Sequence, residues 1–395
     1  MIYLDWASTT APDADVLHEA AAVAATAYGN PSSRHSLGAE ARSQLEEARG
    51  RMARALGVAG SGRIVFTGGG SEADALPLLA LLRQALSSRR DGSIKPLHIV
   101  TTEIEHSAVY EQALLLKSLG VALSIIRPER DGRVDPERIA AAVGRETALV
   151  AVMAVNNETG AVQDVGGVAE AVARASAGLG RKPPRFHVDA VQALGKIHLP
   201  LAGLGVTSAA FSAHKIRGPR GAGVLWLAGD FDPIAVGGGQ EGGYRPGTES
   251  LQSAWAFARV ATEAVAALEE NRRRARLLEA RLIDGLASRV GAVPLPLGRR
   301  PGDEAYSPFI LSAAFPGLSG EVFVRALSDE GIAVSTGAAC SSNQHKKGRR
   351  VLAAMGLDDD LALSSIRIST GPDSSEGDVD HFLETAEALY RRLKA

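Results

Sequence analysis

Two charged side chains lie directly after short apolar segments in the middle of the sequence. Asp189 stands near the end of FHVDA, and Lys215 follows the next such segment, TSAAFSA, after one histidine. In an open parallel sheet the carboxyl ends of the strands line the ligand crevice, so this placement can bring a carboxylate and an amine face to face. The pair fits either a buried salt bridge or a ligand that uses both groups. Pyridoxal phosphate uses both, because it needs an amine for its aldehyde and a carboxylate beside its pyridine nitrogen.

A glycine-rich turn, TGGGSEADAL at residues 67–76, follows the apolar segment RIVFT and precedes a helical pattern. Glycines let backbone N–H groups approach an anion at the positive end of a helix, and the Ser71 hydroxyl adds a donor. The turn therefore predicts either a phosphate site or an ordinary flexible connection. The sequence contains no G-x-x-x-x-G-K-[ST] pattern, which argues against a P-loop nucleotide site.

Three further residues have side chains suited to chemistry. His106 and Asn157 each follow an apolar segment, where a hydrogen-bonded histidine and a turn asparagine are the ordinary interpretations. Cys340 is the only cysteine in 395 residues, so it forms no disulfide within the chain. It stands in STGAACSS, whose small side chains provide little packing, and we expect a mobile loop over residues 335–350.

The composition is that of a globular protein without a strong charge. Hydrophobic residues make up 45% of the chain and charged residues 22%, and the formal net charge is -2. Such a balance gives no field that steers toward nucleic acid or an acidic membrane surface, so we expect small molecules and proteins as partners. The start MIYLDWASTT has no basic region followed by a long apolar run, and we expect a cytoplasmic protein.

Strand-like and helix-like segments alternate through the first 230 residues. We expect strands at residues 63–67, 97–102, 122–126, 147–155, 185–190, 207–213 and 221–228. We expect helices at residues 36–56 and from about residues 72, 107 and 136. The alternation predicts an α/β fold with a mainly parallel sheet covered by helices on both faces, in which 221–228 is an antiparallel member. A long helical stretch at 251–288 then leads to further strands and a final helix, and the length of the chain suggests two domains.

Ten short motifs follow one another along the chain: YLDWASTT, YGNPSSRHSLG, FTGGGSEAD, TEIEHSAV, VNNETGAVQD, FHVDAVQALGK, FSAHKIRGPRG, GGGQEGGYRPGT, STGAACSS and SSIRIS. Together they resemble cysteine desulfurases of the NifS/IscS type, in the class V aminotransferase group of fold-type I pyridoxal-phosphate enzymes. The resemblance implies a homodimer with a mainly parallel seven-stranded sheet and a smaller α+β domain. Residues 15–255 would form the large cofactor-binding domain, and residues 1–14 and 256–395 the small domain that carries the Cys340 loop.

The resemblance also implies a role for each candidate residue. Lys215 would bind the aldehyde of pyridoxal phosphate, Asp189 would pair with the pyridine nitrogen, and Gln192 would approach the ring hydroxyl. The other implied contacts are His106 stacked on the ring, Asn157 beside the ring and the substrate, Gly70, Ser71, Ser212 and His214 at the phosphate, Thr248 reaching into the site of the other subunit, and Arg367 on the substrate carboxylate.

The implied reaction removes sulfur from L-cysteine and gives L-alanine and a persulfide on Cys340. The persulfide would pass to an acceptor protein such as an iron–sulfur scaffold, and Cys340 would be at most a transient cluster ligand, with no intrinsic metal. Lys215 is the natural base for the Cα proton. An ordinary cysteine, with a pKa of ~8.5, is mostly thiol at neutral pH, so His106 or the substrate's own groups would have to take its proton.

Two alternatives remain open at this point. One is another class V enzyme, such as a selenocysteine lyase or an aminotransferase, although an aminotransferase does not need the thiol of Cys340. The other is a catalytically silent scaffold, which the intact set of candidate residues argues against. Gly242 and Ser250 stand where many relatives have Arg and Asn, and the chain stops soon after its last helix, so the physiological sulfur acceptor stays open.

Overall fold

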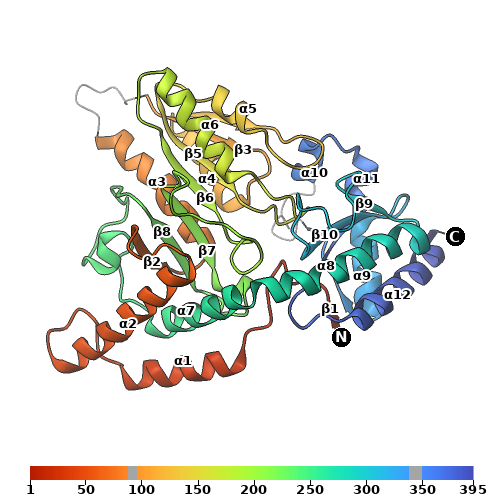
Figure 1. The fold of residues 1–395 in the computed structure, drawn as a ribbon, viewed down its shortest axis with the longest axis horizontal. Coiled ribbons are helices and arrows are strands. Elements are labelled where there is room, and N and C mark those ends of the chain that lie inside the picture. The colour runs from red at the N-terminus through yellow and green to blue at the C-terminus, as the bar shows by residue number, and fades with distance from the viewer. Residues whose placement is uncertain (88–95, 338–348, 395) are drawn as a thin grey trace.

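The computed structural model describes residues 1–87, 96–337 and 349–394 (Figure 1). Most of the predicted 335–350 loop, including Cys340, lies outside the described residues. The described residues form a seven-stranded sheet, a three-stranded sheet and a two-stranded sheet with helices packed around them, and both termini lie on the side of the two smaller sheets. None of the helices in these ranges is long and apolar enough to cross a membrane.

The large sheet has seven strands. Their order is β2 (Arg63–Thr67), β8 (Gly223–Leu227), β7 (Ser208–Ser212), β6 (Arg185–Asp189), β5 (Thr147–Met153), β3 (His98–Thr102) and β4 (Ala122–Ile126). β8 is antiparallel to both of its neighbours, and the pairs from β7 to β4 are parallel. The central strands are almost wholly buried, as in a sheet with both faces covered. The prediction of a mainly parallel sheet with residues 221–228 antiparallel is therefore confirmed.

Helices cover both faces of this sheet. They are α1 (Ala14–Thr26), α2 (Ser36–Ala55), α3 (Gly70–Ser87), α4 (Ser107–Ser118), α5 (Pro136–Ala141), α6 (Val165–Gly178) and α7 (Leu251–Ala266). Alternate strand residues point to opposite faces. Ile99 and Leu149 accordingly pack with α3 and α4, whereas Val100 and Val150 belong to the core formed with the other helices. α1 and α6 are not among the helices expected from the sequence.

The small sheet has three antiparallel strands in the order β12 (Ser365–Ser369), β10 (Ile310–Ala314) and β9 (Val293–Leu295). Next to it β1 (Ile2–Tyr3) pairs in parallel with β11 (Ile332–Ala333). The accompanying helices are α8 (Leu268–Gly285), α9 (Gly320–Asp329), α10 (Arg350–Ala354), α11 (Asp359–Leu363) and α12 (Glu376–Lys394). Figure 1 shows α7 and α8 running one after the other from the large sheet to the small one.

The small sheet has a core of its own, which includes Leu4, Phe315, Phe323 and Phe382. Leu4 joins this core because β1 lies against β11, so the start of the chain belongs to the same packing unit as its end. The domain boundaries expected from the sequence, 15–255 and 256–395, stay a prediction.

Candidate active site

Asp189 and Lys215 come from neighbouring parallel strands. Asp189 is the last residue of β6, and Lys215 ends the 3-10 turn Ala213–Lys215 (η1) that follows β7. The register pairs Asp189 with Ala210, so the two strands end at the same edge of the sheet. Burial raises the pKa of Asp189, while His106, the Val191 N–H and Lys215 act to lower it. The charges of His106 and Lys215 both act on Asp189, so the three side chains lie near one another at this edge of the sheet.

The N-terminal segment forms one wall of the site. The Lys215 ammonium donates hydrogen bonds to the backbone carbonyls of Ala7 and Ser8, both at 2.7 Å. Thr9 Oγ1 lies 3.2 Å from His214 Nδ1, and the Thr10 N–H donates to the His214 carbonyl at 2.8 Å. Sequence reasoning gave no role to this segment, although the polar run in DWASTT was a signal that could have been followed.

His106 caps the helix that follows β3. Its Nδ1 accepts a hydrogen bond from the Ala108 N–H at 3.2 Å, so the neutral ring carries its proton on Nε2. Burial lowers the pKa of His106, with Asp189 opposing and Lys215 and Arg350 adding to the effect. His106 is therefore a flat neutral ring beside Asp189. Such a ring suits stacking on an aromatic ligand.

The glycine-rich turn places the start of α3 against the end of β7. Gly70 is the first residue of α3 and is buried. A Cβ at this position would lie 2.8 Å from Val191 Cγ2 and 3.2 Å from Ser212 Cβ. Gly70 and Ser212, both predicted to bind phosphate, are thus neighbours, and the first-turn N–H groups of α3 lack helical partners. This is the chemistry of an anion site at a helix N-terminus.

Arg367 reaches the site from β12 of the small sheet. Its guanidinium donates to Asn157 O at 2.8 Å, to Asp5 Oδ1 at 2.9 Å and to Ser8 Oγ at 2.6 Å. Its Nε is buried and has no hydrogen-bond partner among the described residues. Arg367 therefore contacts Asn157, the other residue assigned to the substrate, through the Asn157 backbone carbonyl. Asp5 and Ser8 were missed.

The remaining candidates are placed less closely. Gln192 is buried; its Nε2 donates to Ala7 O and its Oε1 accepts from Lys196. Burial together with Lys215 lowers the pKa of His214 to about 4. Ser71 is exposed in the first turn of α3. Thr248 is exposed between η2 (Gln240–Gly243) and α7, and no hydrogen bond joins it to the rest of the described chain.

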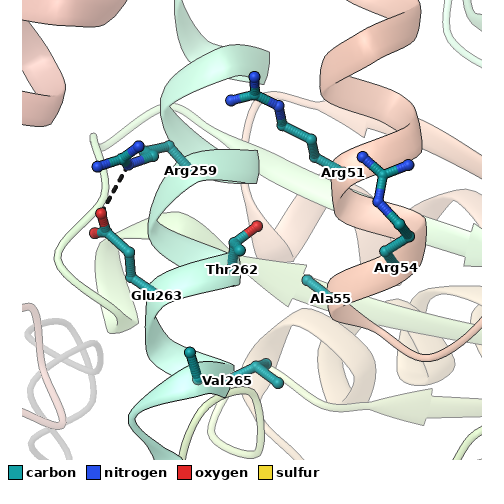
Figure 2. A pocket seen from close by; sticks show the side chains of 8 residues that line it. Arg51, Arg54, Ala55, Arg259, Thr262, Glu263 and Val265 are labelled. Atoms are coloured by element: carbon teal, nitrogen blue, oxygen red, sulfur yellow. Dashed lines mark hydrogen bonds and ion pairs between the residues drawn. The ribbon is translucent and has the colours of Figure 1, made fainter.

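A surface groove elsewhere holds none of the predicted residues. It has a volume of about 740 Å³ and lies between α2 and α7 (Figure 2). Its charged lining is Arg51, Arg54, Arg259 and Glu263, of which Arg259 and Glu263 are paired. The chemistry-bearing residues converge instead at the carboxyl edge of the large sheet.

The residues at that edge fit pyridoxal phosphate. The site offers an amine on Lys215, a buried carboxylate on Asp189, a flat ring on His106 and a glycine at a helix start that leaves space beside Ser212. The unpartnered buried Nε of Arg367 leaves a donor for a carboxylate.

Comparison with known proteins identifies the family. Residues 2–382 match the sequence profile described as Aminotransferase class-V. The chain belongs to the class V aminotransferase family. The chain is 32% identical over 397 residues to the cysteine desulfurase IscS of Dictyoglomus turgidum, an alignment that covers 100% of this chain and 95% of that protein.

Solved structures agree with this assignment. One, titled NifS-like protein, is 34% identical with a TM-score of 0.88 and covers 99% of both chains. Another, SspA in complex with cysteine, is 25% identical with a TM-score of 0.77, covering 95% of this chain and 100% of that one. The resemblance to NifS/IscS cysteine desulfurases, the fold class, the enzyme class and the cofactor pyridoxal phosphate are thereby confirmed. The roles of the individual residues stay predictions.

Proposed function

We propose that this member of the class V aminotransferase family takes L-cysteine as its substrate and transfers the sulfur to Cys340. The observation that carries the proposal is the position of Ser8. Its carbonyl accepts from Lys215 and its hydroxyl accepts from Arg367, so the amine and the guanidinium flank a single residue. An α-amino acid has its amine and carboxylate on one carbon. Lys215 and Arg367, which both bond to Ser8, are close enough together to serve the two groups of such a substrate. The cysteine-bound relative supports L-cysteine in particular.

Each residue then has a defined task. Arg367 binds the substrate carboxylate through the Nε that the fold leaves unpaired. Asp189 holds a proton on the pyridine nitrogen, and Lys215 Nζ removes the substrate's Cα proton. Pyridoxal phosphate, when bound, withdraws electrons from that carbon.

The sulfur step rests on Cys340, which lies beyond the described residues. Its thiolate attacks the substrate sulfur, the Cβ–S bond breaks, and the Cβ carbon gains a proton. L-Cysteine and the enzyme thiol thus become L-alanine and an enzyme persulfide, with atoms and electrons balanced. Because His106 Nδ1 already accepts from Ala108, the substrate's own groups are the better acceptor for the thiol proton.

The assembly and cellular setting extend the same proposal. Thr248 is exposed and not bonded to other described residues, which suits a residue that serves the site of the other subunit in a homodimer. The persulfide sulfur would go to an acceptor protein, such as a scaffold on which iron–sulfur clusters are assembled. A cytoplasmic location stays a prediction from the sequence.

The test is an anaerobic incubation of the purified protein with L-cysteine and a reductant, in which alanine and sulfide are measured together. The wild type should form both in equal amounts. Lys215→Ala should form neither, Cys340→Ser should bind cofactor but release no sulfide, and the exposed Lys117→Ala should behave as wild type. Sulfide release at the native rate by Cys340→Ser would refute the role of the thiol. Bound cofactor without alanine would point to another substrate, selenocysteine first.

A further inference from the structure

A second buried lysine lies behind the cofactor residues. Lys196 is only 9% exposed, and its Nζ donates to Gln192 Oε1 at 2.7 Å. The charges that act on it are those of Lys215 and Arg367, both positive, and no carboxylate in residues 1–87, 96–337 and 349–394 forms an ion pair with it. Burying an amine without an acidic partner is unfavourable. Packing alone therefore does not explain why a lysine is buried at position 196.

The Gln192 side-chain amide explains why Lys196 is buried here, because both the oxygen and the nitrogen of this amide form hydrogen bonds. Its Nε2 donates to Ala7 O at 2.9 Å, the same carbonyl that accepts from Lys215 at 2.7 Å. If the amide were turned over, Nε2 would face the Lys196 amine and Oε1 would face Ala7 O. Both hydrogen bonds would then be replaced by donor–donor and acceptor–acceptor contacts. While Lys196 is protonated, Lys196 and Ala7 together thus allow one orientation only.

We propose that Lys196 is a positioning residue, which fixes the Gln192 amide with its nitrogen toward Ala7 and Lys215 so that Gln192 presents a donor to the cofactor's ring oxygen. One N–H of Nε2 goes to Ala7 O, and the second is left for that oxygen. The inference rests on the proposed function, in which Gln192 and Lys215 line the cofactor pocket.

The ability of Lys196 to exclude the turned-over amide depends on its charge, because only the ammonium form lacks an acceptor. Burial, reinforced by Lys215 and Arg367, lowers the pKa of Lys196 to about 7. A neutral amine still donates to Oε1, but its lone pair can also accept from Nε2 of a turned-over amide, so Ala7 O alone then sets the orientation. The titratable and charged groups that interact with Lys196 are Lys215, Arg367 and His214. The contribution of Lys196 to cofactor affinity should therefore be larger below pH ~7 than above it.

Cofactor affinity of the apo-enzyme tests the inference without reference to turnover. Lys196→Met keeps the length and removes the donor, and Lys117→Met is the exposed control on α4. Titration with pyridoxal phosphate, followed by protein fluorescence, should give about tenfold weaker binding for Lys196→Met and no change for the control. In a Gln192→Ala background, Lys196→Met should cause no further loss. Unfolding curves of each variant show whether the fold is kept.

Three results would overturn the inference. The first is wild-type affinity in Lys196→Met. The second is an equal loss with and without Gln192, since Lys196 would then act on its own. The third is a loss confined to pH values above ~7, where the neutral amine no longer excludes the turned-over amide. If the wild type itself bound no pyridoxal phosphate, the cofactor assignment would fall first, and the inference with it.

Discussion

Replacement of Gly70 by alanine tests the proposed phosphate site most directly. Gly70 opens α3 without a positive φ, so alanine suits its backbone and the effect is steric alone. The new Cβ would lie 2.8 Å from Val191 Cγ2 and 3.2 Å from Ser212 Cβ. The valine methyl can rotate away, but Ser212 Cβ is fixed by β7. The clash is therefore relieved by moving the start of α3 away from Ser212.

The size of the effect follows from this geometry. Overpacking a buried position costs ~1–3 kcal/mol, and every 1.4 kcal/mol of binding energy is about tenfold in affinity. Moving α3 also separates its first-turn N–H groups from the Ser212 hydroxyl, so the donors no longer converge on one phosphate. We expect Gly70→Ala to unfold at lower denaturant concentration and to bind pyridoxal phosphate at least about tenfold more weakly.

The assay is a titration of the apo-enzyme with pyridoxal phosphate, together with urea unfolding. Gly178→Ala is the matched control, because Gly178 also lies in a helix and a Cβ there meets nothing within 4 Å. That control should bind normally and unfold at the same or slightly higher urea concentration. Unchanged cofactor affinity in Gly70→Ala would refute the reasoning and place the phosphate elsewhere.

Two further variants test the substrate contact and the buried acid. Arg367→Lys should raise the KM for L-cysteine about tenfold or more, because a lysine offers neither the bidentate fork nor the Nε donor; an unchanged KM would argue against carboxylate binding at this residue. Burial raises the pKa of Glu105 from 4.5 to about 8, so at intermediate pH the folded state holds a proton that the unfolded state has lost. The free energy of unfolding should therefore fall as pH rises from 4.5 to about 8, and Glu105→Gln should remove this slope in urea unfolding across that range. Parallel pH profiles of variant and wild type would contradict the assignment.

The sequence was informative where the determining interactions are local. The strand segments at 63–67 and 122–126 match β2 and β4 residue for residue, because a short apolar run bounded by turn residues is a local signal for a strand. Asp189 and Lys215 could be placed at strand ends for the same reason. α1 was missed because its alanine-rich sequence buries only Val16 and Ala20, which leaves little apolar periodicity to detect.

The sequence by itself thus determined the family, the cofactor and which candidate residues lie at the ends of the strands. Only the tertiary structure decided how the start of the chain completes the site, with Ser8 between Lys215 and Arg367 and with Ala7 O between Lys215 and Gln192. These partners lie far apart in the sequence, and hydrophobic periodicity reports which face of an element is buried, not which distant segment covers it. The orientation of a side-chain amide, such as that of Gln192, depends on the donors and acceptors that folding places around it.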